Sequence, residues 1–212
     1  MNKAKTFVVA FIFTLPTTYI QADELRGSLS YVFSSVQFED DYNNLLDIDT
    51  NIIGISGKYF LEESGPFVGL ALGRQEVSAI TLNGQTLLTP DSDVTVTAFS
   101  FGYRGGETGK PQAYGQAGIT LMNSDDDSSN VINLALGIEQ TYEQGRLDTA
   151  LSYGNSKDSS TLGIGSTATL FLNENIGLQA LFGASFGSAK MLDTDVDALS
   201  WHFGVGLEIR SK

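Results

Sequence analysis

The sequence predicts an all-β fold, a transmembrane antiparallel up-and-down β-barrel of about ten strands, with eight as the alternative. The clearest strand is LSWHFGVGLEI, residues 199–209, in which apolar residues alternate without a break with small or polar ones. Successive side chains of a strand point to opposite faces, so one face here is wholly apolar. The run has about the 9–11 residues that a tilted strand needs to cross a bilayer. Its other face carries glycines rather than the charges typical of a strand that faces water.

The N-terminal residues have the three parts of a secretory signal: a basic start, an apolar core at 7–15 and a polar end. We place the cleavage after Ala22, which divides the chain into a signal peptide, 1–22, and a barrel domain, 23–212. The apolar core is too short for a spanning helix, and no later stretch is a helical span. Membrane residence therefore depends on strands.

Composition limits the function. The chain has no cysteine, which excludes a disulfide frame, a thiolate metal site and an acylated cysteine. The formal charge is −13, and it becomes −15 when Lys3 and Lys5 leave with the signal. Such an acidic chain lacks the basic patch that nucleic acid requires, so nucleic acid is excluded as a partner.

The first five strands are separated by turn-forming residues. A polar stretch at 39–50, a tight turn at 62–66 and a turn at 105–111 connect them, and Asn83-Gly84 predicts a type I′ turn in a ribbon that projects from the membrane. The predicted outward faces are Leu29, Tyr31 and Phe33; Ile53, Ile55, Gly57, Tyr59 and Leu61; Val68, Leu70 and Leu72; and Thr95, Thr97, Phe99, Phe101 and Tyr103. In the fifth strand, 113–122, Tyr114 and Ile119 compete for the outward register.

The last five strands alternate in the same way. Tight turns are predicted at 143–145 and 173–175, and loops at 124–129, 155–160 and 189–198. The predicted outward faces are Ile132, Leu134, Leu136, Ile138 and Tyr142; Leu147, Thr149, Leu151 and Tyr153; the apolar positions of 162–172; Ile176, Leu178, Ala180, Phe182, Ala184 and Phe186; and the final strand. The loops hold the extracellular candidates Asp125, Asp126, Asp127, Asp193, Asp195 and Asp197, in addition to Asn83 and Gly84.

Outward aromatic residues fall at two levels. If odd strands run outward, Tyr59, Tyr103 and Tyr142 lie at the periplasmic rim, whereas Tyr153 and Trp201 lie at the outer rim with Phe33 and Phe186. Two aromatic girdles are typical of an outer-membrane barrel, as is an even strand number with tight periplasmic turns and longer outer loops. A soluble β-sandwich, the alternative, would cover its apolar faces with a second sheet.

From its signal, strand pattern and girdles, the chain resembles the small outer-membrane β-barrels of Gram-negative bacteria, the OmpA/OmpX-like and porin-like group. The resemblance covers residues 23–212 and includes no diagnostic motif. It implies export through the periplasm to the outer membrane, contact with outer-membrane lipid and lipopolysaccharide, and insertion by the barrel assembly machinery. Two departures are the count of ten strands, where eight are common, and the lack of a terminal aromatic residue in Ile209-Arg210-Ser211-Lys212.

The inward face predicts a wide upper lumen with charges below. Its upper half is small: Ser34, Gly54, Gly69, Ala71, Gly73, Ala135, Ser152, Gly154, Gly163, Gly165, Ser185 and Gly187. The charged candidates for a constriction in the periplasmic half are Lys58, Arg104, Glu139, Asp148, Glu208 and Arg210. They have a structural interpretation as paired buried ions and a functional one as a conducting or gating constriction.

No catalytic, cofactor or metal site is expected. Ser200, His202 and Glu208 face the lumen, but Glu208 lies three pairs from His202, which is too far for a relay at about 3.3 Å per residue. Asp193-x-Asp195-x-Asp197 starts like a calcium loop but lacks its glycine and its closing acid. Loop carboxylates that share divalent cations with lipopolysaccharide are a weaker variant, and Arg74 is placed to meet the same phosphates.

We therefore expect a non-enzymatic outer-membrane barrel with a structural or surface-interaction role, presenting acidic outer loops. The alternative is a narrow porin-like channel for small solutes or ions. The oligomeric state is left open, and a lipid hydrolase that uses His202 is the third hypothesis.

Overall fold

The computed structural model describes residues 24–40, 44–61, 64–88, 93–107, 109–124, 127–191 and 194–211. Its strands are β1 (Glu24–Glu39), β2 (Leu45–Phe60), β3 (Pro66–Leu82), β4 (Gln85–Leu88), β5 (Asp93–Gly105), β6 (Gln112–Asn123), β7 (Ser128–Tyr142), β8 (Gly145–Asn155), β9 (Ser159–Phe171), β10 (Ile176–Met191) and β11 (Thr194–Arg210). Among these residues there is no helix of a length and hydrophobicity that would cross a bilayer. The predicted signal peptide lies outside the described residues.

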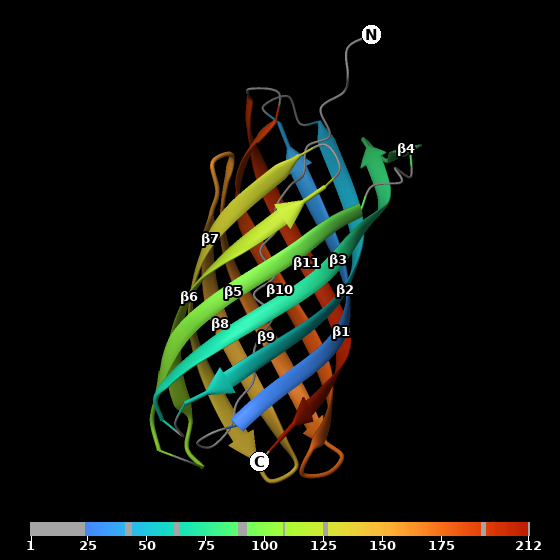
Figure 1. The fold of residues 1–212 in the computed structure, drawn as a ribbon. Helices are drawn as coiled ribbons and strands as arrows, with labels where there is room; N and C mark the ends of the chain where they lie inside the picture. Colours follow the sequence, from blue (N-terminus) through green and yellow to red (C-terminus); the bar gives the residue numbers. More distant parts are fainter. Residues whose placement is uncertain are drawn as a thin grey trace.

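Ten strands form one closed antiparallel barrel (Figure 1). Each pairs with its neighbours in the chain, β3 pairs with β5, and β1 pairs with β11 to close the ring. The short strand β4 pairs only with β3 and lies outside the ring. The predicted up-and-down barrel is confirmed, and the strand count is ten rather than eight.

The connections differ at the two ends of the barrel. The connections β2–β3, β5–β6, β7–β8 and β9–β10 join strand ends that lie at the lower end in Figure 1, where the chain also ends. The β3–β4 turn lies at the opposite end, with Asn83 at a φ of 48° and Gly84 at 80°. Two successive positive φ angles are those of the predicted type I′ turn.

An apolar belt surrounds the barrel. Leu136 is 70% exposed, Phe101 66% and Val205 62%. A soluble monomer does not expose so continuous an apolar surface, whereas lipid covers it. The predicted girdle residues all point outward and are exposed: Tyr59, Tyr103, Tyr142, Tyr153 and Trp201. At the outer rim, Trp201 stacks on Phe203 at 6.1 Å and contacts Phe33 at 5.4 Å, measured between ring centroids.

Beyond the belt the barrel is longer than predicted. The stretch 39–50 is not a loop, because β2 begins at Leu45, and 189–198 is not a loop, because only residues 192 and 193 separate β10 from β11. Asp195 and Asp197 are therefore strand residues of β11 rather than loop residues. Similarly, the β3 ribbon is not isolated, since β3 pairs with β2 as far as Leu82.

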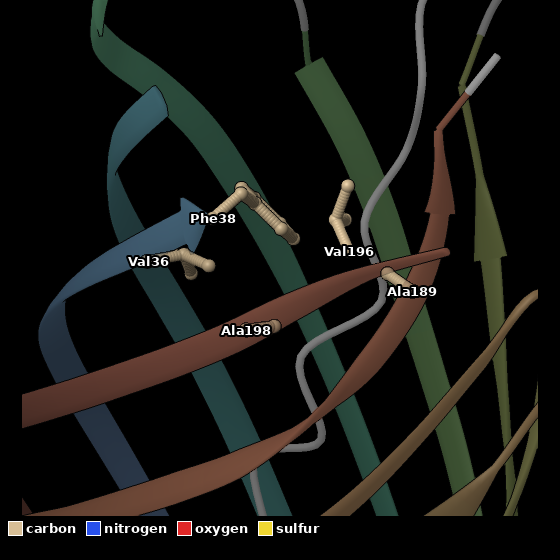
Figure 2. Packing of buried hydrophobic residues seen from close by; sticks show 5 residues of the cluster. All are labelled: Val36, Phe38, Ala189, Val196 and Ala198. Atoms are coloured by element: carbon tan, nitrogen blue, oxygen red, sulfur yellow. The ribbon is translucent and has the colours of Figure 1, made fainter. Parts of the chain in front are cut away.

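The alternation continues in this outer extension, but the two faces exchange their polarity. Outward side chains become polar, as in Gln37 and Asp47, and inward ones become apolar. The inward cluster, called the outer collar below, consists of Val36, Phe38, Ala189, Val196 and Ala198 (Figure 2). Leu46, Ile48 and Met191 pack against it. Water outside the membrane replaces lipid, so the extension folds like the wall of a soluble barrel.

The register of the fifth barrel strand, β6, is settled in favour of Ile119 outward and Tyr114 inward. Tyr114 lies opposite Gly137 on β7, and a Cβ at Gly137 would lie only 2.3 Å from the Tyr114 ring. The glycine therefore provides the space that an inward tyrosine needs.

The belt predicts a position-dependent cost for charge on β7. Leu136→Arg, at mid-belt, should lower the free energy of unfolding by about 2–4 kcal/mol, and Asn130→Arg, beyond the belt on the same strand, by about 0–1 kcal/mol. Urea unfolding in phosphatidylcholine vesicles, followed by the fluorescence of Trp201, measures both. Equal costs at the two positions would contradict a lipid-facing belt.

Candidate functional site

The lumen contains a buried layer of seven charged side chains near the tight-turn end. This lumen layer consists of Arg26, Lys58, Arg104, Glu139, Arg146, Asp148 and Glu208, each between 0% and 3% exposed. They come from six strands, and the side chains that contact them come from the remaining four: Phe67 of β3, Tyr114 and Gln116 of β6, Thr169 of β9 and Gln179 of β10. All ten barrel strands thus contribute to one layer across the lumen.

Arg146 is the centre of the ionic half of the layer. Its guanidinium donates to the Glu208 carboxylate at 2.6 Å and to the Thr169 hydroxyl at 3.2 Å, and its Nε lies 3.7 Å from the Glu139 carboxylate. Gln179 donates a further hydrogen bond of 2.8 Å to Glu208. Charged groups are retained in a buried site when they are paired and hydrogen-bonded in this way.

Aromatic rings line the other half. Arg104 and Arg26 lie over the Phe60 ring, with their Cζ atoms 4.9 and 5.7 Å from its centroid. The Lys58 Nζ lies 4.2 Å from the centroid of Phe67 and donates 2.9 Å to the Gln116 amide oxygen. Such cation–π contacts stabilise cations out of water.

Tyr114 joins the two halves. Its hydroxyl donates to the Asp148 carboxylate at 2.7 Å, and its ring packs with Phe60, Phe67 and Ala150. Tyr114 was not predicted as a member of the site, because its inward register was left open. The hydrogen bond to a buried carboxylate gives the polar end of an inward tyrosine a partner.

The predicted constriction residues are distributed in two groups. Lys58, Arg104, Glu139, Asp148 and Glu208 belong to the lumen layer. Arg210 lies below it, half-buried, with its Cζ 3.9 Å from the Phe171 centroid and its Nε donating to the carbonyl of Glu174.

Sequence reasoning missed Arg26 and Arg146. Both lie just before the predicted starts of their strands, and extending the alternation backwards by one pair from Ser28 or Asp148 would have placed them inward. The register pairs Arg26 with Lys58, and Arg146 with Thr169.

The residues weighed for hydrolysis do not converge. Ser200 shares a hydrogen bond of 2.7 Å with Ser185, while the Glu208 carboxylate is bonded to Arg146 and Gln179. Glu208 lies six residues beyond His202, about 20 Å at 3.3 Å per residue. Over the described ranges, no group of three or more His, Asp or Glu side chains is arranged to hold a metal.

The outer candidates lie apart from the layer. Asn83 and Gly84 form the β3–β4 turn, and the Asn83 amide oxygen accepts from the Leu45 backbone N–H at 2.9 Å. Asp127 lies in the β6–β7 connection, and its carbonyl accepts from Ser124. Asp125, Asp126 and Asp193 lie outside the described residues. Arg74 is exposed and pairs with Asp93 and Glu76.

Comparison with known proteins identifies the fold. No protein-family model matches this chain, and no curated protein matches its sequence. The outer-membrane protease OmpT from Escherichia coli superposes with a TM-score of 0.52 and 9% identity, covering 93% of this chain and 100% of that one. The β domain of the Bordetella autotransporter BrkA has a TM-score of 0.54 and 14% identity, with coverage of 87% and 98%. This likeness extends to the fold alone, which is that of an outer-membrane β-barrel.

Removing Arg146 should test how the layer is held together. Arg146→Met removes the cation that contacts two buried carboxylates, Glu139 and Glu208, and we expect it to lower the free energy of unfolding by about 3–5 kcal/mol. Arg74→Met, which breaks an exposed pair, is the matched control and should cost less than about 1 kcal/mol. The double variant Arg146→Met/Glu208→Gln should recover part of the loss. Urea unfolding in vesicles measures all three, and additive costs in the double variant would show that the two residues do not interact.

Proposed function

We propose that this chain is a sealed barrel of the bacterial outer membrane with a structural or surface-interaction role, which presents an acidic outer surface. We further propose that residues 1–22 direct its export through the periplasm, that the barrel assembly machinery inserts it, and that it has no catalytic activity. The observation that carries the proposal is the lumen layer.

A conducting pore needs a continuous path of water or of polar groups that can exchange partners. In the lumen layer, hydrogen bonds and ion pairs of 2.6–3.7 Å run from Arg146 on β8 to the adjacent strands β7 and β9 and across the lumen to β11, and cation–π contacts fill the opposite half. The charged groups therefore contact one another and the aromatic rings across the lumen, while several of their nitrogen and oxygen atoms, such as Arg146 Nη1 and Asp148 Oδ2, have no hydrogen-bond partner among the described residues. This arrangement supports a closed barrel over an open one.

The outer end of the barrel is strongly acidic. Its described acidic residues outnumber the basic residues Arg74, Lys157 and Lys190: they are Glu39, Asp40, Asp47, Asp49, Glu76, Asp93, Asp127, Asp158, Asp195 and Asp197. Glu39 lies directly opposite Asp197 in the β1–β11 register, and both are exposed. Like charges across a strand pair are destabilising, which favours a surface that binds cations.

We therefore propose that this acidic surface binds lipopolysaccharide through bridging cations. Carboxylates of the outer extension and loops would share divalent cations with the phosphates of lipopolysaccharide, and the exposed Arg74 would approach the same phosphates. The proposed surface includes the turn at Asn83 and Gly84 and the loop residues that the sequence singled out.

The proposed surface role predicts that neutralising the outer carboxylates abolishes binding to lipopolysaccharide. Replacing Glu39, Asp47, Asp195 and Asp197 by their amides should abolish magnesium-dependent binding of the reconstituted barrel to lipopolysaccharide-containing vesicles, measured by co-flotation. Replacing Glu143 and Glu174, at the tight-turn end, by glutamine is the matched control. Unchanged flotation of the first variant would reject the proposed surface.

A closed lumen predicts that the protein does not conduct ions across a planar bilayer. The reconstituted protein, shown to be folded by its heat-modifiable mobility, should give no steady conductance above that of the bare bilayer. The competing function is a narrow channel in which the lumen layer is the constriction. A steady small conductance that changes with Glu139→Gln would establish that channel and overturn the sealed barrel.

A further inference from the structure

The lumen above the charged layer contains a cavity of about 90 Å³. This volume is well above the roughly 10–15 Å³ that a single water needs. On β3 the lining runs from Gly69 to Gln75, which is about 20 Å at 3.3 Å per residue. The β3 part of the lining is therefore long enough to accommodate an extended chain of the length of a dodecanoate molecule.

Small residues create the space on one side of the lumen. Ala71 lies opposite Ala98, and Gly54 lies opposite Gly73, across β2, β3 and β5. A Cβ at Gly69 would lie 2.6 Å from the Ser100 hydroxyl, so no larger residue fits at this position without a shift. At the upper end, Val96 and Met122 belong to an apolar cluster with Val94 and Val131. The walls are thus aliphatic along most of the length.

Lys58 does not line the cavity itself but lies beside its lower end, next to residues that do. The Lys58 side chain lies against Gly69, since a Cβ there would be 3.2 Å from the Lys58 Cγ, and its ammonium donates to the cavity-lining Gln116. Within the described part of the chain, no carboxylate forms an ion pair with Lys58. An ammonium has three donors, so this one can donate to an anion in the cavity.

At the upper end of the cavity, a buried amide without a hydrogen-bond partner among the described residues favours a bound ligand. Gln75 is 8% exposed and lines the cavity, yet its side-chain amide makes no hydrogen bond to any described residue. The Asn133 amide oxygen, on the far wall, is likewise buried without a partner. A buried polar group without a partner is costly, and a bound molecule with an oxygen at this level would remove the cost.

We propose that the cavity binds a linear aliphatic carboxylate that carries a second oxygen at its far end. The carboxylate would accept from Lys58 at the floor, the chain would lie along the small-residue wall, and the far oxygen would bond to Gln75. An apolar pocket with few, well-placed polar groups is the usual form of a small-molecule site. Because the lumen layer closes the floor, the ligand enters through the outer collar. This inference goes beyond the proposed surface role and depends only on the closed floor.

Photolabelling in detergent-free phosphatidylcholine vesicles tests the proposed site. The lipid-facing side of the same strands is the internal control. The probe is a dodecanoate that carries a ω-hydroxyl and a mid-chain diazirine, used with the full reconstituted protein. Labelling is expected on the lumen side of β5 and β6, at Val96 and Met122. Labelling confined to the lipid side of the same strands, at Phe99 and Ile119, would overturn the proposal.

Competition with unlabelled molecules tests the two polar ends. ω-Hydroxydodecanoate should displace the probe from Val96 and Met122 better than dodecanoate does, and dodecanoate better than dodecanol, each step by about tenfold. Gln75→Leu should abolish the first difference and Lys58→Gln the second. Equal competition by all three molecules in the unmodified protein would reject both polar contacts and the proposal with them.

A third test uses variants that leave every charged residue in place, so that loss of labelling cannot be attributed to disruption of the lumen layer. Ala71→Leu should fill the wall and abolish lumen labelling, whereas Ala180→Leu, on the lipid-facing side of β10, should leave it unchanged. Heat-modifiable mobility confirms that both variants are folded. Undiminished lumen labelling in Ala71→Leu would reject the cavity as the binding site. This outcome is independent of the conductance measurement that tests the sealed barrel.

Discussion

The structure depends on the closure of its backbone hydrogen bonds. In hydrocarbon there is no water to satisfy an N–H or C=O group, so strands cross a membrane only as part of a ring without edges. The β1–β11 pairing, from Arg26↔Arg210 to Glu39↔Asp197, provides this closure between the two ends of the chain. Among the described strands, β4 pairs with β3 alone, and it lies beyond the belt, where water can satisfy its free edge. Side chains are then free to differ along each strand according to the medium that they meet.

That freedom explains why one alternating pattern has two meanings in the same strand. In the lipid belt the outward residue is apolar, as in Leu29 and Tyr31, and the inward residue is small or polar. A few residues later the outward residue is Gln37 and the inward residues are Val36 and Phe38. The strand continues while its surroundings change from lipid to water, so the polarity of the two faces is exchanged and the lumen acquires an apolar collar at its outer end.

The same reasoning shows what the sequence could and could not predict. Alternation against lipid was strong enough to identify the ten strands, the belt and five of the seven layer charges. The pattern predicts loops at the outer ends of β2, β10 and β11, because their outward residues, such as Asp47 and Asp195, are acidic and their apolar residues point inward. Arg26 and Arg146 were missed because an inward position beside a turn differs from a solvent-exposed one only after the register is known. Tyr114 depends on Gly137 across the strand pair, a complementarity that neither strand reveals alone.

In an eight-stranded barrel the inward side chains just fill the interior. A ten-stranded barrel is wider, so its lumen has to be filled by longer side chains, by water or by a ligand. Near the tight turns the chain fills it with long charged side chains, of which Arg146 forms ion pairs with Glu139 and Glu208 and others lie against aromatic rings. Higher up it places glycine, alanine and serine, which leave space, and then an aliphatic ring that meets water at the mouth. Charged groups are kept away from the outer collar, because an ion there would lose its hydration without gaining partners. The boundary between the two levels lies at Lys58 and Gln116, which is where the chemistry of any molecule held in the lumen must also change from polar to aliphatic.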